Sequence, residues 1–407
     1  MIELLQRLGC YPRYCVWELT LACDMRCLHC GSYAGTRRDD ELSVPEMEQV
    51  ADQLAAMHCE KVTLGGGEPT LHPRWHDLGR RLSDQGVRVN MISNGWSWSP
   101  DHLEKARHAR LTNMAFSLDG FEDAHDAVRK PGSFQKVVAA LDDCARAGFP
   151  ASVVSHVNRL NAHRLGEFRT FLGQHRVSSW QIQLGIPSGA LRDNRDLVIQ
   201  PEDLLWLIPQ IAALRTDPTP GPAVLAADNV GYFGRHEKPL RDRGAEISFW
   251  IGCRAGMQVI GIESNGNVKG CLSLPSARHG NDRFVEDNLR RRSLKEIWED
   301  SKAFAWNRGF TESQLGGFCA VCRYRDICRG GCAWTAYSHT NDRFDNPYCF
   351  YRQVLVAGQL QELGDDVPNA AELAMAASLR VVGEAGVTAV APDALDASVT
   401  RADETQV

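Results

Sequence analysis

Between Trp17 and about Arg215, short apolar runs alternate with helical stretches, and this alternation restricts the possible folds more than any other feature of the sequence. Each run is short and bounded by turn residues, which is typical of a buried strand. The runs predict strands at Val16–Thr20, Lys61–Leu64, Val87–Ile92, Asn113–Leu118, Ser152–His156 and Trp180–Leu184.

A helix is expected after each of these strands. The first begins after Ser43, where Glu46 stands three residues on and completes a capping box. Gly86 and Gly148 stand where two other helices should stop. The predicted helices are Val44–Met57, Trp75–Gln85, Pro100–His108, Phe134–Ala147, Ala162–His175 and Pro201–Leu214.

Six strand–helix units indicate a parallel sheet with helices outside it. Eight such units would close a full (β/α) barrel, so six favour a partial, open one. The predicted fold class is therefore α/β, a partial (β/α)6 TIM barrel. Ligands of such folds bind at the carboxyl ends of the strands, so candidate site residues are sought there.

Three cysteines follow the first strand at the spacing C-x3-C-x2-C, and they are Cys23, Cys27 and Cys30. Cysteine thiolates are the usual ligands of iron–sulfur clusters, and a four-iron cluster has four such positions. Three cysteines leave one iron open to a small molecule, although a structural zinc loop is the simpler alternative. After the second strand comes the turn Gly65-Gly66-Gly67-Glu68-Pro69.

Together, these two stretches resemble the radical S-adenosylmethionine (SAM) enzymes. The resemblance implies that Cys23, Cys27 and Cys30 hold a [4Fe–4S] cluster whose open iron is chelated by the amino and carboxylate groups of SAM. It implies that one electron from the cluster cleaves SAM to methionine and a 5′-deoxyadenosyl radical, which abstracts hydrogen from substrate.

Further candidate SAM contacts follow from the resemblance and from the polar residues at the strand ends. Glu68 and the adjacent backbone are expected to bind the amino group, and Arg129 the carboxylate. His125, Asp126 and Arg129 are expected in a loop. Each candidate could instead serve turn chemistry, and no catalytic residue is assigned. Ser117 and Asp119 are candidates for the ribose, and Pro187 and Ser188 for the adenosine. The full set of candidate SAM contacts is Gly66, Gly67, Glu68, Asn94, Ser117, Asp119, Arg129, His156, Pro187 and Ser188.

Composition limits the compartment and the partners. The chain has 407 residues, enough for two or three domains, and a net charge of -6, which argues against a nucleic-acid surface. Arg290-Arg291-Arg292 is interpreted as a solvated face. No signal peptide and no membrane-length apolar run is visible. We therefore expect a soluble, cytoplasmic protein, in which the fourteen cysteines are metal ligands rather than disulfides.

A second group of cysteines lies in the C-terminal half. A hairpin is expected from Ile260–Glu263 and Val268–Cys271, and a helix is expected to run toward Phe304. The alternative interpretation of these cysteines is a zinc-ribbon-like module, because two C-x2-C-like pairs can hold zinc. The cysteines are Cys253 and Cys271 in C-x12-G-x4-C, then Cys319, Cys322, Cys328 and Cys332 in C-x2-C-x5-C-x3-C, and finally Cys349.

This pattern resembles the SPASM extension of certain radical SAM enzymes, a small α+β domain with two auxiliary clusters. The resemblance implies three [4Fe–4S] clusters in all. Fully ligated members carry one more cysteine after the first, and Ala255–Val259 offers none, so the first auxiliary cluster is expected to have an open iron or a non-cysteine ligand. Cys253, Cys271 and Cys332 are assigned to the first auxiliary cluster, and Cys319, Cys322, Cys328 and Cys349 to the second.

The expected organisation has five parts. Beyond Asp365 the sequence lacks clear periodicity, and one short helix is expected around Ala371–Leu379. The parts are an N-terminal segment (1–13), the barrel (14–215), a Pro-rich linker (216–245), the SPASM domain (246–355), and a C-terminal helix with a mobile tail (356–407).

The resemblance is strongest to maturases of ribosomally made peptides, through Trp17–Thr20, the Cys27–Cys30 ending of the loop, and Gly330-Gly331-Cys332. It implies hydrogen abstraction from a peptide or protein side chain to install a crosslink, an epimerisation or an oxidation. A separate peptide-recognition protein and a flavodoxin- or ferredoxin-type electron donor are expected. The alternatives are modification of a tetrapyrrole side chain in a haem pathway, and a non-catalytic iron–sulfur electron carrier.

Overall fold

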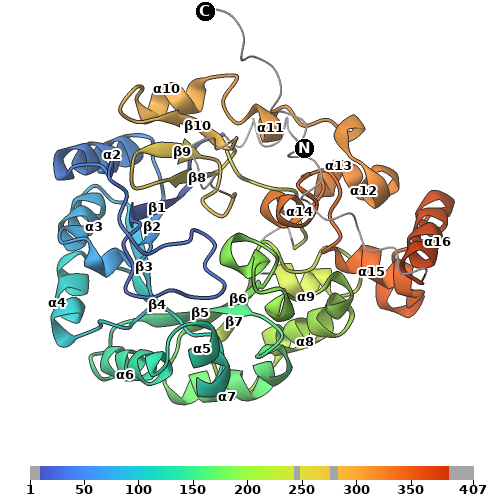
Figure 1. The fold of residues 1–407 in the computed structure, drawn as a ribbon, viewed down its shortest axis with the longest axis horizontal. Coiled ribbons are helices and arrows are strands. Elements are labelled where there is room, and N and C mark those ends of the chain that lie inside the picture. The colour runs from blue at the N-terminus through green and yellow to red at the C-terminus, as the bar shows by residue number, and fades with distance from the viewer. Residues whose placement is uncertain (1–9, 243–247, 276–282, 385–407) are drawn as a thin grey trace, which may run out of the picture.

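A single ten-stranded sheet forms the centre of the molecule in the computed structural model, which describes residues 10–242, 248–275 and 283–384 (Figure 1). The strand order is β10-β9-β8-β1-β2-β3-β4-β5-β6-β7. The strands are β1 (Tyr14–Thr20), β2 (Lys61–Gly66), β3 (Arg88–Ser93), β4 (Asn113–Ser117), β5 (Ala151–Val157), β6 (Ser179–Leu184), β7 (Ala223–Ala226), β8 (Val259–Ile262), β9 (Asn267–Lys269) and β10 (Val285–Asn288).

Neighbouring strands from β1 to β7 are all parallel, as the six predicted units require. The predicted partial barrel is confirmed, and all six predicted strands are present. The linker prediction is wrong in part, because Ala223–Ala226 forms a seventh parallel strand beside Ser179–Ile182. Prolines at 218, 220 and 222 concealed it, although Val224 and Ala226 are buried in the sheet. Helix α9 (Glu237–Arg241) also lies within the expected linker.

Helices cover the outer face of the curved sheet (Figure 1). Each of the six predicted helical stretches is helical, although the last two begin with a 3-10 turn. His125 and Asp126 do not lie in a loop but in α5, because the first helix-breaking residues after them are Pro131 and Gly132. The barrel helices are α2 (Val44–Ala56), α3 (Trp75–Asp84), α4 (Pro100–His108), α5 (Glu122–Val128), α6 (Ser133–Arg146), α7 (Leu165–Gln174) and α8 (Leu204–Thr216).

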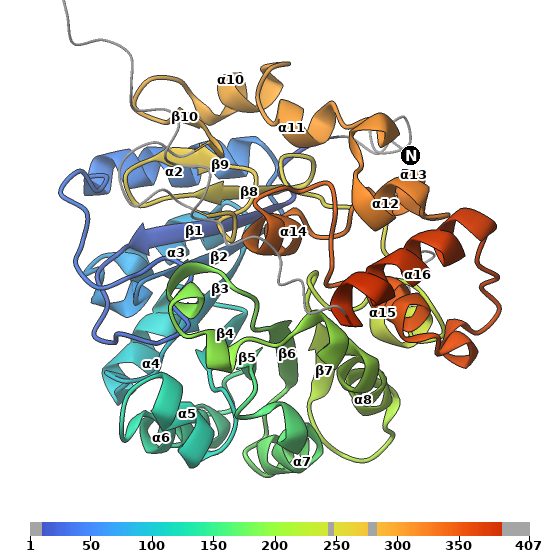
Figure 2. The same ribbon diagram turned by 45° about the vertical axis from the view of Figure 1, so that its right-hand side comes forward.

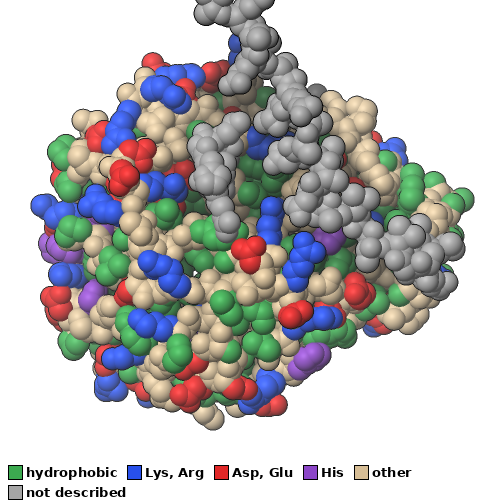
Figure 3. All heavy atoms as spheres, in the orientation of Figure 1, with side chains coloured by type: hydrophobic (Ala, Val, Ile, Leu, Met, Phe, Trp, Pro, Cys, Tyr) green, Lys and Arg blue, Asp and Glu red, His purple; other side chains and the backbone are tan. Residues whose placement is uncertain are grey.

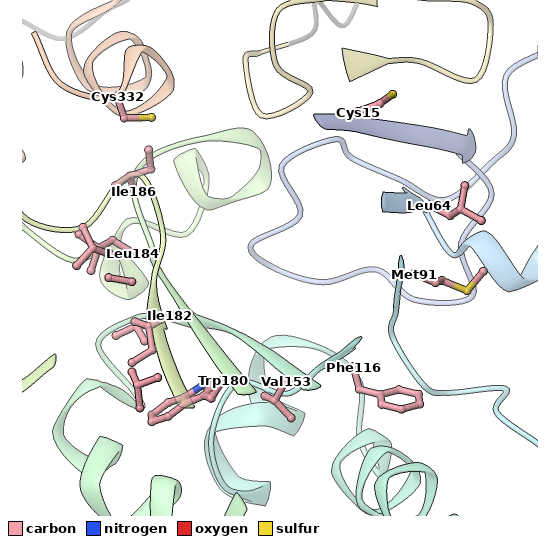
Figure 4. Close-up of a cluster of buried hydrophobic side chains, with 14 of the residues drawn as sticks. Cys15, Leu64, Met91, Phe116, Val153, Trp180, Ile182, Leu184, Ile186 and Cys332 are labelled. Atoms are coloured by element: carbon pink, nitrogen blue, oxygen red, sulfur yellow. The ribbon is translucent and has the colours of Figure 1, made fainter. Parts of the chain in front are cut away.

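The core consists of side chains that successive strands contribute between the sheet and its helices. Figure 4 shows Leu64, Met91, Phe116, Val153 and Trp180 from neighbouring strands, and all five are fully buried. One segment, Arg195–Thr216, is long and apolar enough to span a membrane by length and composition alone. Its helix α8 buries Leu204, Leu207, Ile208 and Ile211 in the core, which explains its apolar character.

The C-terminal half begins as an extension of the same sheet. Strand β8 runs parallel to β1, and β8 and β9 form the predicted hairpin (Figure 2). The helix expected to reach Phe304 ends at Glu299, because the Asp300 side chain accepts the Lys302 N–H at 2.9 Å and turns the chain. The last helix is longer than expected and begins at Ala370. The helices are α10 (Leu294–Glu299), α11 (Ala305–Arg308), α12 (Gly317–Val321), α13 (Arg325–Cys328), α14 (Ala333–Thr340), α15 (Phe350–Ala357) and α16 (Ala370–Glu384).

Charged side chains of both signs are interspersed on the face shown in Figure 3. The arginine run at 290–292 lies on the surface and is paired with carboxylates: Arg290 with Glu46 at 2.6 Å, and Arg292 with Asp300 at 2.9 Å. This agrees with its interpretation as a solvated face. Of the expected C-terminal helix and mobile tail (356–407), the residues from 385 onward lie outside the described residues.

Candidate functional site

The first three cysteines lie on a loop that leaves the carboxyl end of β1 and folds back on itself. The Cys23 N–H donates to the Gly35 carbonyl at 3.0 Å, and the Cys30 N–H donates to the Cys27 carbonyl at 3.2 Å. Burial raises the pKa of Cys23 to about 11, and burial raises the pKa of Cys27 as well. Because thiolates are the metal-binding form, a cation is needed to displace their protons at neutral pH.

The glycine turn after β2 contacts the cysteine loop through its backbone. The Gly67 N–H donates to the Thr20 carbonyl and the Glu68 N–H to the Ala22 carbonyl, both at 2.8 Å. A Cβ atom at Gly66 would lie 2.3 Å from the Thr20 oxygen, and one at Gly67 would lie 2.2 Å from the Ala22 oxygen. Only glycine permits this approach, so both predicted glycines position the cysteine loop.

Glu68 is buried and its carboxylate is bound within the protein. Oε1 accepts from the Thr70 and Ser93 hydroxyls at 2.7 and 2.9 Å, and Oε2 accepts the Asn94 N–H at 2.7 Å. Burial raises the pKa of Glu68. The structure therefore shows Glu68 joining the turn after β2 to the end of β3. Its expected contact with the SAM amino group stays a prediction.

Asp119, after β4, is fully buried and joins four segments. Its Oδ2 atom lies 2.9 Å from His29 Nε2, and its Oδ1 accepts the His156 N–H at 2.8 Å. Arg129 donates to both carboxylate oxygens. Although burial opposes it, the charges of Arg129 and His29 hold the pKa of Asp119 well below its usual range. The expected contact of Asp119 with the SAM ribose stays a prediction.

Arg129, the predicted partner of the SAM carboxylate, forms this ion pair with Asp119 and is mostly buried beside the Cys27 thiol. Asp119 keeps the Arg129 guanidinium charged and raises its pKa against the effect of burial. Arg129 therefore supplies a fixed positive charge next to the first cysteine group.

His29 was missed by sequence reasoning, although its position between Cys27 and Cys30 could have indicated a role. Its ring packs edge-on against the ring of His156, with a centroid distance of 4.3 Å. The Nδ1 atoms of both rings are buried without a hydrogen-bond partner among the described residues. Burial and the neighbouring His29 charge hold the pKa of His156 well below its usual range, so its ring is neutral.

The remaining predicted SAM contacts lie at neighbouring strand ends. Asn94 donates to Asp24 Oδ1 on the cysteine loop at 2.7 Å, and Ser117 is half-buried at the end of β4. The turn containing Pro187 and Ser188 approaches the same loop, since the Ala190 N–H donates to the Cys30 carbonyl at 3.0 Å. The structure thus gathers the predicted residues at one edge of the sheet.

The second set of cysteines forms two groups, with the members that the resemblance implied. Cys319, Cys322, Cys328 and Cys349 line one cavity together with aromatic side chains such as Tyr232 and Tyr351. Burial raises the pKa of each of these four thiols.

The other group consists of Cys253, Cys271 and Cys332. The charge of Cys253 raises the pKa of both Cys271 and Cys332, in addition to the effect of burial, because the three thiols are close. No disulfide joins any cysteine among the described residues. The Ser188 hydroxyl accepts the Trp334 N–H at 3.0 Å, so α14, which follows Cys332, contacts the barrel near the first cysteine loop.

The three groups fit iron–sulfur clusters. Each group contains at least two thiols whose pKa burial raises. The buried Nδ1 atoms of His29 and His156 stand beside the first group without partners among the described residues. Soft thiolate donors in groups of three and four are the ligands that iron–sulfur clusters use.

Two family models match parts of the chain. Residues 17–168 match the Radical SAM superfamily, and residues 253–323 match the SPASM iron–sulfur cluster-binding domain. The curated relatives include mycofactocin maturase MftC of Mycobacterium tuberculosis (strain CDC 1551 / Oshkosh), which is 32% identical over 82% of this chain and 81% of that protein. They also include an AdoMet-dependent heme synthase of Methanosarcina barkeri, which is 27% identical over 84% of this chain and 97% of that protein.

A solved structure has the same fold. Streptococcus suis SuiB bound to its precursor peptide SuiA superposes with a TM-score of 0.67, covering 85% of this chain and 77% of that one, at 15% sequence identity. Members of the superfamily use SAM with a [4Fe–4S] cluster, and the SPASM segment adds further iron–sulfur clusters. The chain belongs to the radical SAM superfamily, and it is a radical SAM enzyme with a C-terminal SPASM domain.

Proposed function

We propose that this enzyme modifies a side chain of a peptide or protein. The observation that carries the proposal is the convergence of the loop of Cys23, Cys27 and Cys30 with the glycine turn and Arg129 at one edge of the barrel. A SPASM segment with two further cysteine groups accompanies it, and the relationship to mycofactocin maturases spans both segments.

The chain's own residues have separate roles in this proposal. When bound, SAM and the reduced cluster supply a 5′-deoxyadenosyl radical that abstracts hydrogen from the substrate. Gly66 and Gly67 let the backbone approach the cysteine loop, and Glu68 fixes the turn against β3. Asp119 keeps Arg129 charged beside Cys27, and it orients His29 on the cluster loop.

Three clusters are proposed, one on each cysteine group. A flavodoxin- or ferredoxin-type protein would supply the electron. The described residues belong to the barrel, to the cysteine-rich segment or to the C-terminal helices. Among these described residues, no further folded unit is left that could recognise a peptide. We therefore propose that a separate protein presents the peptide.

Modification of a tetrapyrrole is the second candidate. The heme synthase of Methanosarcina barkeri matches over 97% of its own length, so its whole architecture corresponds to this chain. A non-catalytic electron carrier is disfavoured, because such a protein has no use for Arg129 and a glycine turn beside a three-cysteine loop.

The test is 5′-deoxyadenosine formation by the reconstituted, anaerobically reduced enzyme. Separate reactions contain SAM alone, SAM with each short peptide encoded beside the gene, and SAM with an iron-containing porphyrin that carries propionates. The Cys27→Ala variant is expected to form none. The matched control is Cys144→Ala, because Cys144 is buried on the outer helix α6, away from the three cysteine groups.

Strong stimulation by a peptide, with a change in the peptide's mass, would support the proposal and would name the reaction. Stimulation by the porphyrin alone would favour the tetrapyrrole alternative. A wild-type enzyme that holds clusters but never cleaves SAM would leave only the electron carrier.

A further inference from the structure

Two buried arginines lie beside Cys253 without a carboxylate partner. Four arginines of the described residues are almost completely buried. Two of them have ordinary ion pairs, Arg169 with Asp217 at 3.1 Å and Arg352 with Asp345 at 2.8 Å. The other two are Arg329 and Arg343, which are 2% and 5% exposed and pair with no carboxylate among the described residues.

The polar contacts of these two arginines are with neutral groups. Arg329 donates to the Asn307 carbonyl at 2.5 Å and contacts Met257 Sδ at 3.4 Å. Arg343 donates to the Trp306 carbonyl and lies 3.4 Å from Asn307 Oδ1. The Nε atom of each guanidinium has no hydrogen-bond partner among the described residues.

Both guanidinium groups also face the same aromatic ring, that of Phe310. The Arg329 and Arg343 groups lie 4.7 and 5.5 Å from the centre of the Phe310 ring. A cation–π contact stabilises a single cation. It does not neutralise two like charges, which need an anion when they are removed from water.

The geometry connects both arginines to Cys253. Asn307, which accepts hydrogen bonds from both, donates through Nδ2 to the Cys253 carbonyl at 2.9 Å. The chain at Gly252 touches Arg329, since a Cβ atom there would lie 2.9 Å from Arg329 Cδ. Cys253 is the anion-forming side chain that acts on both guanidinium groups, whereas Asp342 acts on Arg343 alone. Together with these contacts, this places the fitting anion on Cys253.

We propose that Arg329 and Arg343 are the counter-charge of an iron–sulfur cluster held by Cys253, Cys271 and Cys332, and that they raise its reduction potential. The inference rests on the proposed cluster at these three cysteines. Reduction adds one electron and thus one negative charge to the cluster. Two fixed cations stabilise that reduced form more than the oxidised form, which shifts the potential upward.

The experiment is a redox titration of the full-length protein, followed by electron paramagnetic resonance. The background carries Cys23→Ala, Cys27→Ala and Cys30→Ala, so that only auxiliary clusters contribute. Arg343→Met and Arg329→Met are compared with Arg343→Lys, which keeps the charge. The matched control is Arg169→Met, because Arg169 is equally buried but lies on α7 beside Asp217.

Each methionine variant is expected to shift the potential of one auxiliary cluster to a more negative value and to leave the other unchanged. Arg343→Lys and Arg169→Met are expected to leave both near the wild-type values. Unchanged potentials in both methionine variants, with iron content retained, would overturn the proposal. Loss of iron-dependent signals already in the parent background would instead refute the auxiliary clusters and thus the proposed function.

A second measurement covers variants that load little iron. In cluster-free protein, replacing an unpaired buried cation by methionine should raise the unfolding temperature, whereas in reconstituted protein it should lower it. The same direction of change in both forms would overturn the counter-charge role.

Discussion

At the scale of single residues, the buried carboxylate of Asp119 holds several parts of the site together. Its carboxylate binds Arg129 and His29 and accepts the backbone N–H of His156. Ser117 and Asp119 stand together at the end of β4, where a ribose contact is predicted. The ion pair with Arg129 forms because a buried carboxylate requires charged or hydrogen-bonding partners from the protein.

Asp119→Asn is expected to destabilise the cluster-free protein by about 3–5 kcal/mol, because it leaves the Arg129 charge buried without its partner. SAM-dependent activity should fall with it. Urea unfolding at neutral pH measures the first effect and 5′-deoxyadenosine formation the second. The control is Asp142→Asn, which breaks a more exposed pair with His175 and should change stability by about 1 kcal/mol or less. Equal effects of the two variants would contradict the role of Asp119.

His125 gives a prediction for pH dependence. Its Nδ1 atom accepts the Asp119 N–H at 3.0 Å, and burial lowers the pKa of His125 from 6.5 to about 4. As the pH falls, His125 therefore becomes protonated near pH 6.5 in the unfolded chain, but only near pH 4 in the folded chain. Because the unfolded state binds more protons in this window, stability falls as pH falls through it.

Between pH 7 and pH 5, this histidine should remove about 2 kcal/mol of the free energy of unfolding. In the cluster-free protein, His125→Gln should reduce the measured loss by that amount, although it lowers stability at pH 7. His108→Gln, at an exposed position of α4, is the comparison variant. A pH profile of His125→Gln parallel to that of the wild type would exclude the assignment.

At the scale of elements, the glycine turn after β2 and the cysteine loop after β1 form one unit. The turn donates two backbone hydrogen bonds to the segment that begins the cysteine loop. This close approach requires glycine at positions 66 and 67. Gly67→Ala is expected to prevent the loop from closing, to lower the iron content by the share of one of the three clusters, and to reduce SAM binding at least tenfold. The matched substitution is Gly65→Ala, two residues earlier, where a Cβ atom has nothing within 4 Å.

Iron content after reconstitution and SAM binding by equilibrium dialysis measure this difference, with far-UV circular dichroism as the check on folding. Gly65→Ala should retain wild-type values of both. If Gly67→Ala also retains them, the close approach of the two loops is not required for the site.

At the scale of the whole molecule, the C-terminal segment completes the sheet that the barrel begins. Strand β8 pairs with residues Tyr14 to Trp17 of β1, and Arg38 joins Glu18 to Ser264 across the same boundary. A strand edge as apolar as β1 would otherwise stand open to pairing with other chains. The two family matches, at 17–168 and 253–323, therefore lie on one continuous sheet.

We expect the barrel and the SPASM segment to unfold together. The Ile260 side chain on β8 is fully buried. In the cluster-free protein, Ile260→Asp should lower the midpoint temperature of one unfolding transition that both segments share. Tryptophan fluorescence and circular dichroism should give the same midpoint. Asn265→Ala, at a half-buried position of the hairpin turn, should lower that midpoint far less. Two separated transitions in Ile260→Asp would show instead that the halves are independent.

The sequence by itself determined the local features of this protein. The strand–helix alternation, the Ser43–Glu46 cap and the cysteine spacings each depend on residues a few positions apart, and all are found as predicted. The tertiary structure alone decided what long-range contacts control. These are the seventh strand behind the prolines, the pairing of β8 with β1, and the ion pair that occupies Asp119. A spacing in the chain specifies which side chains can share a local site, but only packing specifies which distant charge a buried side chain meets.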